Sequence, residues 1–424
     1  MVYDCYSGTE CLVLRRYRAK LPHEPADRVA SCGRGSVPKI LLNPMRDPSF
    51  AVAPPTEAAR RLHRQLPGYQ PTPLVALPDL ADRLGLAELA LKDESRRFGL
   101  PAYKVLGAVW AACRALGPRL GLAPDSVGGL DSVRAALNGR PRLVLVTATD
   151  GNHGRGVARV ARWLGCDAEV FLPAGSARSR VQGIASEGAR VVEVAGTYDE
   201  AVAQAARAAA RPDALLLQDH GQPGYEEIPR WVAEGYETIF AEIEGARAAA
   251  RGGDFDLVLV QIGVGTLAAA AVGHYRANGR RRRPALVGVE PDGAACALAS
   301  IEAGSPVMLE VGPDASIMAG LNCGTPSTAA WPLLQSAIDA FVSVSDERDR
   351  EAMRLLAARG IESGESGAAG LAGLLELMQP SGAICRSALG IGRETRVLLI
   401  STEGVTDPVR WRQIVGRSPQ GPPP

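Results

Sequence analysis

Short apolar runs that alternate with helical patterns limit the possible folds of this 424-residue chain more than any other feature. This alternation predicts an α/β architecture with parallel strands. In such sheets, ligands bind at the carboxyl ends of the strands, where loops enter helices. Four strand-like runs are each followed by a clear helical segment: 143–147 by 153–164, 168–172 by 176–187, 191–194 by 198–210, and 215–217 by 228–244. Three further strand-like runs are 257–262, 286–289 and 397–400.

Length and composition indicate a soluble protein of two or three domain-sized units, because the chain is too long for one small core. The contents of 46% hydrophobic and 22% charged residues are ordinary for a globular protein. A net charge of +1 gives no electrostatic reason to expect nucleic acid or a membrane surface as a partner.

The eight cysteines include no Cys-x-x-Cys pair, so no structural metal site is predicted. They are scattered among apolar segments, as in a cytoplasmic protein with reduced thiols. The first residues lack the apolar core that a signal peptide needs. Residues 257–273 carry no charge, but Gly263 and Gly265 interrupt them. We therefore predict a buried strand, a turn and a buried helix there, and no membrane span.

Lys104 is the first candidate for chemistry, at the end of a segment that reads as a strand end, a turn and a helix start. A lysine is a weak nucleophile unless it is desolvated or near positive charge, and its commonest covalent use is a Schiff base with a carbonyl compound. A lysine near a helix start is most often only a solvated surface residue. Other motifs must therefore support this assignment.

The glycine-rich loop 147–156 follows a predicted strand and opens a helix. Its exposed N–H groups favour an anion such as a substrate carboxylate. Asn152 can donate to a phenolate oxygen on a cofactor ring, and Asp150 and His153 are possible acid/base groups. The alternative is a capped helix start, with Asp150 or Asn152 as the N-cap.

A second loop, 261–267, also joins a strand to a helix start. It lacks the spacing of a dinucleotide fingerprint or of a Walker loop. A phosphate held by backbone N–H groups and by the Thr266 hydroxyl fits this loop, and a plain tight turn is the alternative. The residues of this predicted phosphate cradle are Gly263, Val264, Gly265, Thr266 and Leu267.

The third loop begins where the late strand ends, at Ser401, and continues through Thr402. A hydroxyl at that sheet edge would suit a pyridine nitrogen that stays largely unprotonated. The alternative is a plain polar turn. Together, a lysine, a phosphate cradle and a second ionisable group are typical of an enzyme that uses pyridoxal 5′-phosphate.

These loops resemble those of fold-type-II pyridoxal-phosphate enzymes and, more narrowly, of the diaminopropionate ammonia-lyase family. The likeness runs from about residue 38 to residue 407 and includes an aspartate, Asp150, before the glycine of the first loop. Further matching segments are 66–74, 92–107, 224–229, 317–324, 363–368 and 401–407. The resemblance implies a tryptophan synthase β-like fold with two three-layer domains and mostly parallel sheets.

The resemblance also implies a role for each matching residue. Lys104 would form the Schiff base with the cofactor and move protons, and Asp150 would be a second base on the opposite face. Two bases on two faces allow an enzyme to take the α-proton from both the D and the L substrate. Asn152 would hold the ring oxygen, the 263–267 loop the phosphate, and Ser401, or with less support Thr402, the ring nitrogen. The implied substrate-binding residues are Thr149, Asp150, Gly151, His153 and Asp219.

The implied reaction is elimination of ammonia from 2,3-diaminopropionate, which leaves pyruvate, in a cytoplasmic homodimer. Where the family has Thr-Ala-Trp after the aspartate, this chain has His220, Gly221 and Gln222, so the loop after Asp219 predicts a changed substrate preference. A serine or threonine dehydratase, a β-replacement enzyme and a non-catalytic cofactor-binding homologue are the alternatives. Cys296 and Cys323 are a possible disulfide or redox-sensitive pair, and two reduced thiols are the alternative.

The predicted domain organisation has a small domain, 138–226, inserted into a larger cofactor-binding domain formed by 38–137 and 227–417. We predict that 1–37 is an irregular extension and that 418–424 is a tail. The cofactor would lie in the cleft between the two domains.

Overall fold

The computed structural model describes residues 29–31, 38–122, 129–149, 151–196, 198–280, 282–312 and 314–420. Within these ranges the strands form one seven-stranded sheet, one four-stranded sheet and one two-stranded pair. The strands are β1 Val29–Ser31, β2 Ile40–Leu42, β3 Leu74–Ala76, β4 Glu88–Asp93, β5 Val144–Ala148, β6 Asp167–Pro173, β7 Arg190–Val194, β8 Ala214–Leu216, β9 Leu257–Gln261, β10 Ala285–Pro291, β11 Met308–Glu310, β12 Ala340–Val344 and β13 Arg396–Ser401.

Helices connect most of these strands. They are α2 Ala58–Arg64, α3 Pro78–Leu84, α4 Val105–Arg119, α5 Leu130–Leu137, α6 Asn152–Leu164, α7 Arg178–Ala185, α8 Tyr198–Ala208, α9 Glu227–Ala249, α10 Thr266–Tyr275, α11 Cys296–Ala303, α12 Trp331–Ala337, α13 Asp346–Ala357, α14 Glu365–Leu377, α15 Ala383–Leu389 and α16 Pro408–Val415. Short 3-10 turns lie at Asp292–Ala294, Ala319–Leu321 and Pro380–Gly382.

The seven-stranded sheet has the order β2-β12-β10-β9-β13-β4-β3. Only its outer strands β2 and β3 run antiparallel to their neighbours. Its central strand β9, with the sequence LVLVQ, is buried along its whole length. A strand that is covered on both faces needs such an unbroken apolar run, because no side of it meets water.

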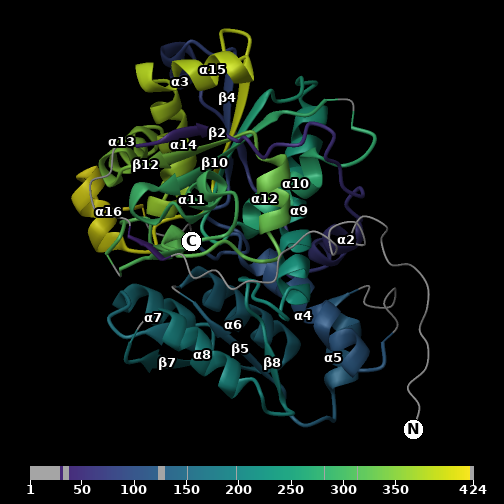
Figure 1. The fold of residues 1–424 in the computed structure, drawn as a ribbon. Helices are drawn as coiled ribbons and strands as arrows, with labels where there is room; N and C mark the ends of the chain where they lie inside the picture. Colours follow the sequence, from purple (N-terminus) through teal and green to yellow (C-terminus); the bar gives the residue numbers. More distant parts are fainter. Residues whose placement is uncertain are drawn as a thin grey trace.

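The four-stranded sheet has the order β7-β6-β5-β8, and all its strands are parallel. In Figure 1 this sheet and helices α6, α7 and α8 lie below the large sheet. The sheet falls within the predicted small domain, whose limits at 138 and 226 stay predictions. The α/β class with mostly parallel sheets is confirmed.

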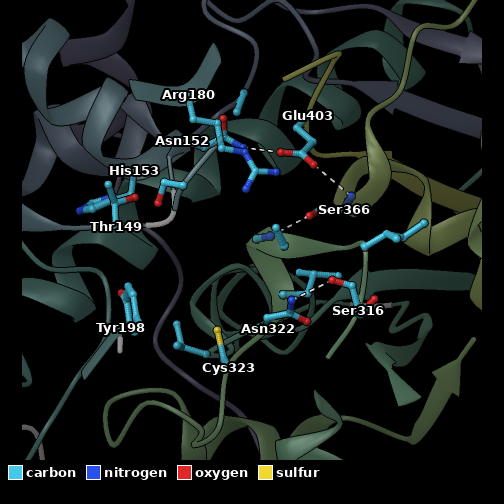
Figure 2. A pocket seen from close by; sticks show the side chains of 18 of the residues that line it. Thr149, Asn152, His153, Arg180, Tyr198, Ser316, Asn322, Cys323, Ser366 and Glu403 are labelled. Carbon is cyan, nitrogen blue, oxygen red and sulfur yellow. Dashed lines mark hydrogen bonds between the residues drawn. The ribbon is translucent and has the colours of Figure 1, made fainter. Parts of the chain in front are cut away.

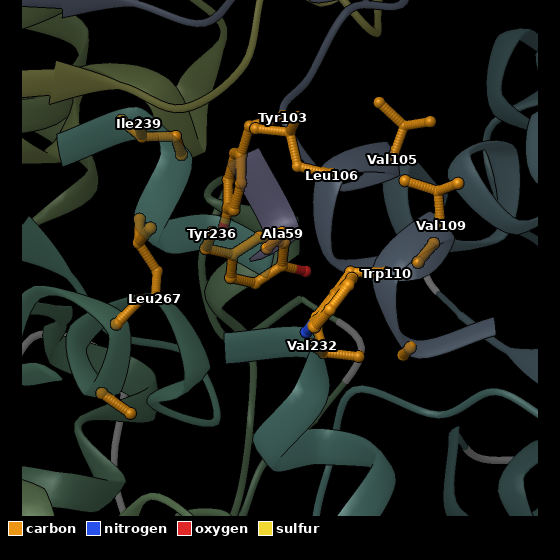
Figure 3. Packing of buried hydrophobic residues seen from close by; sticks show 14 of the residues in the cluster. Ala59, Tyr103, Val105, Leu106, Val109, Trp110, Val232, Tyr236, Ile239 and Leu267 are labelled. Atoms are coloured by element: carbon orange, nitrogen blue, oxygen red, sulfur yellow. The ribbon is translucent and has the colours of Figure 1, made fainter. Parts of the chain in front are cut away.

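Helix α9 packs closely against helix α4 and fixes the start of α4 (Figure 3). A Cβ atom at Gly107 would lie 2.5 Å from the Tyr236 ring, and one at Gly235 would lie 2.6 Å from the Leu106 carbonyl oxygen. Glycine at both positions lets the two backbones approach. The Tyr236 ring also packs edge-on against Tyr103, beside Lys104, with ring centroids 4.6 Å apart.

The predicted strands and helices of 143–289 are confirmed, with boundaries shifted by a few residues. The uncharged stretch 257–273 forms β9, a turn and most of α10, as predicted. In the part of the chain that the structure describes, no helix is long and apolar enough to cross a membrane. Residues 1–28 and 32–37 of the predicted irregular extension, and 421–424 of the predicted tail, lie outside the described ranges.

The short strand β1 was not predicted. It lies within the predicted irregular extension and pairs in parallel with β11, so that Val29 is opposite Met308. This pairing joins segments far apart in the chain. Local periodicity over three residues therefore carries no signal for it.

Candidate active site

The candidate site is a cavity of about 840 Å³ at the carboxyl edges of the two sheets. It is lined by the loops after β4, β5, β9 and β13 and by Asp219, which follows β8. Figure 2 shows side chains from both sheets pointing into it. The predicted loops therefore meet at one place, as the rule for parallel sheets requires.

Lys104 lies at the N-cap position of α4 and lines this cavity. Its Nζ donates a hydrogen bond to Oδ2 of Asp219 at 2.6 Å. Burial favours the neutral amine, but the negative charge of Asp219 outweighs it and holds the pKa of Lys104 well above its ordinary value. Lys104 and Asp219 thus form a tight ammonium–carboxylate pair.

Asp219 is also close to His153, whose Nδ1 lies 3.7 Å from the same Oδ2. The other ring nitrogen of His153, Nε2, lies 2.8 Å from the Leu217 carbonyl oxygen and donates to it. Burial works to raise the pKa of Asp219, but His153 and Lys104 together hold it far below its ordinary value. Asp219 is therefore a permanent carboxylate at neutral pH.

The first predicted loop surrounds the start of α6. Gly151 has a φ of 153°, and a Cβ there would lie 3.1 Å from the stem of Arg180. Its N–H donates to Oγ1 of Thr149 at 3.0 Å. Thr149, Asn152 and His153 line the cavity, whereas Asp150 lies outside the described residues.

Asn152 does not cap α6, because the N-cap residue is Gly151 and Asn152 is the first helical residue. Its Nδ2 instead donates to Oε2 of Glu403, across the cavity (Figure 2). The capping alternative for Asn152 was therefore wrong. Its amide side chain is held at the cavity wall.

The second predicted loop has the form of an anion site. Gly263 to Leu267 all line the cavity, and Gly265 takes the left-handed φ of 95° just before α10 begins. A Cβ at Gly263 would lie 3.1 Å from the Gly320 carbonyl oxygen. The Thr266 hydroxyl already donates to the backbone oxygen of Asp219 at 2.7 Å. Backbone N–H groups are therefore the better candidates to bind a phosphate.

The third predicted loop places its two hydroxyl groups differently. Ser401 is fully buried, its Oγ donates to Oγ of Ser363 at 2.9 Å, and it is not among the described residues that line the cavity. Thr402 does line the cavity, where its Oγ1 donates to the Ser366 carbonyl oxygen at 3.1 Å. Thr402 is therefore the hydroxyl residue of this loop that lines the cavity, and the predicted preference for Ser401 at the ring nitrogen stays a prediction.

No disulfide joins Cys296 and Cys323 in the structure. Both lie against Gly263. Sγ of Cys296 lies 3.6 Å from the carbonyl oxygen of Gly263, and Sγ of Cys323 would lie 3.2 Å from a Cβ atom added to Gly263. Whether they pair on oxidation stays a prediction.

Sequence reasoning assigned no role to several residues that line the cavity, namely Arg180, Asn322, Ser366 and Glu403, although all but Arg180 lie in segments that match the family. Glu403 could have been found from the sequence, because it directly follows Thr402 in the third loop. The buried Oδ1 of Asn322 and Oε1 of Gln261, both from cavity-lining residues, have no hydrogen-bond partner in the described chain. Such unpaired polar atoms are typical of a site that binds a polar ligand.

Comparison with known proteins agrees with this geometry. The model of the pyridoxal-phosphate dependent enzyme family matches residues 65–401. A diaminopropionate ammonia-lyase from Salmonella typhimurium is 39% identical over 84% of this chain and 91% of its own length. This chain belongs to the diaminopropionate ammonia-lyase family.

Solved structures of the Escherichia coli family member extend this result. The holo form has a TM-score of 0.82 at 32% identity and covers 92% of this chain and 98% of its own. A complex with D-serine has a TM-score of 0.80 at 33% identity and covers 89% and 97%. The fold is therefore that of fold-type-II pyridoxal-phosphate enzymes, and pyridoxal 5′-phosphate is the cofactor of this lyase-family chain.

Proposed function

We propose that this chain eliminates ammonia from 2,3-diaminopropionate, which leaves pyruvate and releases a second ammonia on hydrolysis. The observation that carries the proposal is the Lys104–Asp219 pair in a cavity that also holds a glycine-lined anion loop. Lys104 is the amine in this cavity that could form a Schiff base with the cofactor aldehyde once it has lost the proton that it now shares with Asp219. Asp219, which holds that ammonium at 2.6 Å, would then be open to a substrate ammonium group. Family membership gives the reaction class.

The cavity residues fit pyridoxal 5′-phosphate. Lys104 would hold its aldehyde carbon, Asn152 its ring oxygen, and Ser401 or Thr402 its ring nitrogen. Backbone N–H groups of the 263–267 loop would hold its phosphate. The bound cofactor supplies an electron sink for the charge that develops when the α-proton leaves.

Proton movement falls to the side chains. We propose that Nζ of Lys104 takes the α-proton of one enantiomer and that the Asp150 carboxylate takes it from the other. Thr149 and His153, which line the cavity, and Gly151 between them in the chain would hold the substrate carboxylate near the start of α6.

Asp219 is the proposed partner of the substrate β-ammonium group. The structure already shows an ammonium group, that of Lys104, bound to its Oδ2. A carboxylate that stays ionised suits this role, because a charge-assisted hydrogen bond discriminates against a substrate that lacks the amine.

The loop after Asp219 supports diaminopropionate as the substrate despite its altered sequence. Of the four residues 219–222, Asp219 is the one that lines the cavity, and Gln222 is exposed. Gly221 packs against residues 327–329, where a Cβ would lie 2.7 Å from Oγ of Ser327. The substitutions from 220 to 222 therefore change the packing behind the site more than its lining.

The test compares kcat/KM for diaminopropionate, serine and threonine, with ammonia and keto acid measured together. We expect diaminopropionate to exceed both hydroxy amino acids by more than tenfold, because only its β-amine can bind Asp219. A tenfold preference for serine or threonine would replace this proposal with a dehydratase. No turnover of any of the three by cofactor-loaded protein would favour a non-catalytic homologue.

We also propose a cytoplasmic homodimer. The resemblance to the family supports the homodimer. The five described cysteines form no disulfide, which supports a reducing compartment. Sedimentation equilibrium of the loaded protein tests the dimer, and a monomer mass would exclude it.

A further inference from the structure

We infer that Glu403 is a positioning residue of this active site, whose carboxylate orients the amide of Asn152 toward the cofactor. The inference rests on the proposed cofactor site and goes beyond it, because it assigns a role to a residue that need not touch the substrate. Glu403 follows β13 on the large sheet, and Asn152 begins α6 beside the small sheet. The contact therefore joins the two halves of the site.

The Glu403 side chain receives hydrogen bonds from both sides. Nδ2 of Asn152 donates to its Oε2, and the backbone N–H of Ser366 donates to its Oε1 at 3.0 Å. Both contacts are drawn in Figure 2. Ser366 lies in the first turn of α14, so the helix end reinforces the carboxylate. Glu403 is 3% exposed, which means that water competes little for these bonds.

The backbone of Glu403 is held as firmly as its side chain. Its carbonyl oxygen accepts from the Gly364 N–H at 3.0 Å, and the next N–H, of Gly404, donates to the Pro101 oxygen at 2.8 Å. A Cβ at Gly367 would lie 2.4 Å from that same Glu403 oxygen. Glu403 is also bridged to Ala102, two residues before Lys104. The backbone that carries this carboxylate is therefore fixed against the segment that ends at Lys104.

The chemistry of the two side chains defines what this contact does. An ionised carboxylate only accepts hydrogen bonds, whereas an asparagine amide has a donor nitrogen and an acceptor oxygen that can exchange places by a flip. Because the Glu403 carboxylate only accepts hydrogen bonds, the Asn152 side chain must turn its amide nitrogen, and not its oxygen, toward Glu403. The nitrogen carries two hydrogens, so one can bond Glu403 while the other remains for the cofactor ring oxygen.

The Asn152–Glu403 contact could also serve only to hold the two halves of the site together. A glutamine at position 403 distinguishes this structural role from the role of orienting the Asn152 amide. Glutamine keeps one acceptor for the Ser366 N–H but presents an amino group to Asn152, which then turns its oxygen toward residue 403. Structural cohesion is largely kept, whereas the donor that the cofactor needs is moved away.

The experiment is a double-mutant cycle on the full-length protein, with Glu403→Gln, Asn152→Ala and both together. The readouts are the dissociation constant of pyridoxal 5′-phosphate from the apo-protein and the visible absorption maximum of the loaded protein, both without substrate. We expect Glu403→Gln alone to weaken cofactor binding by about tenfold and to shift the absorption maximum. In the Asn152→Ala background the same change should alter the constant less than twofold, because no amide is left to orient.

Glu376→Gln is the matched control. Glu376 is a similarly buried carboxylate on α14, paired with Arg348 at 3.2 Å, and it does not line the cavity. It should leave both readouts unchanged. Equal losses from Glu403→Gln in both backgrounds, or no loss in either, would overturn the inference.

Should Glu403→Gln fail to fold, Glu403→Asp serves in the same cycle, because it keeps the charge and shortens the reach. Since substrate is absent, the result is independent of the proposed reaction. A protein that shows the coupling but releases no ammonia from diaminopropionate would refute the proposed function alone.

Discussion

Two groups of buried charged side chains differ in how their charges are balanced. In the first, the paired cluster of Lys92, Glu94, Arg97 and Glu242, every member is at most 5% exposed. Lys92 donates to Glu242 at 2.7 Å, and Arg97 bonds Glu94 and Glu242 with forked contacts of 2.7–2.8 Å. Two cations and two carboxylates thus satisfy one another beneath the loop that leads to Lys104.

The second group, the unpaired acids Asp349 and Glu365, lies behind the cavity near Glu403. Both oxygens of Asp349 and Oε1 of Glu365 are buried without a hydrogen-bond partner among the described residues. Burial, and then the charge of Glu403, raises the pKa of Glu365 to about 7. Burial and neighbouring carboxylates, of which Glu365 is the first, raise that of Asp349 well above its ordinary value.

The difference separates structure from chemistry. A balanced buried cluster fixes one conformation, and breaking it costs stability. Glu365, whose pKa is raised to about 7, can change charge near neutral pH, as groups at active sites often do. Mutations in the paired cluster should therefore change the free energy of unfolding, whereas mutations at the cavity should change activity.

The largest expected effect is at the cavity. Lys104→Ala should lower kcat/KM for diaminopropionate by about four orders of magnitude or more, because it removes both the cofactor anchor and a base. It should also abolish a borohydride-reducible cofactor linkage, detected by mass mapping. A linkage that persists at another lysine would show that Lys104 is not the anchor.

Asp150→Asn keeps the side-chain shape and removes its basicity. It should slow one enantiomer of diaminopropionate by roughly two to four orders of magnitude and the other much less. Steady-state kinetics on the separate D and L substrates measure this. Equal losses on both would indicate a structural role for Asp150 at the start of α6.

Lys92→Met is the counterpart of Lys104→Ala within the paired cluster. Removing the cation leaves Glu242 with one fewer partner in the interior, so the free energy of unfolding should fall by about 3–5 kcal/mol. Urea unfolding at fixed cofactor concentration measures it. A loss of activity without loss of stability would mean that the paired cluster takes part in chemistry.

Glu365→Gln should have a smaller effect that depends on pH. Between pH 4.5 and about 7, a carboxyl whose pKa is raised on folding from its ordinary 4.5 to about 7 binds more protons in the folded state than in the unfolded state. Burying the ionised Glu365 carboxylate therefore does not lower the free energy of unfolding below about pH 4.5. The loss grows as pH rises from 4.5 to about 7, and it is complete above about pH 7. Relative to wild type, the variant should gain roughly 2–4 kcal/mol at pH 8 and almost nothing at pH 4.5. Urea midpoints at both pH values decide this, and an equal gain at both would contradict the raised pKa.

Much of this organisation could be predicted from the sequence, because its signals are local. Strand and helix periodicity placed the glycine-rich loops at strand ends, where they meet at the cavity. The resemblance to the family, rather than periodicity, singled out Asp219, which lines the cavity, and Gly151, which does not. The parts that were missed depend on distant contacts. The Asn152–Glu403 bond joins residues 251 positions apart, and the Lys104–Asp219 bond joins residues 115 apart. Thr402 rather than Ser401 lines the cavity, and side-chain packing, which the sequence does not show, decides that.

The most direct test of the central claim is the ratio of products formed from diaminopropionate by cofactor-loaded wild-type protein, with Lys104→Ala as the blank. Elimination of the β-amine followed by hydrolysis predicts two molecules of ammonia for each pyruvate, and neither above background with Lys104→Ala. Ammonia and pyruvate no higher for the wild type than for Lys104→Ala would contradict the account.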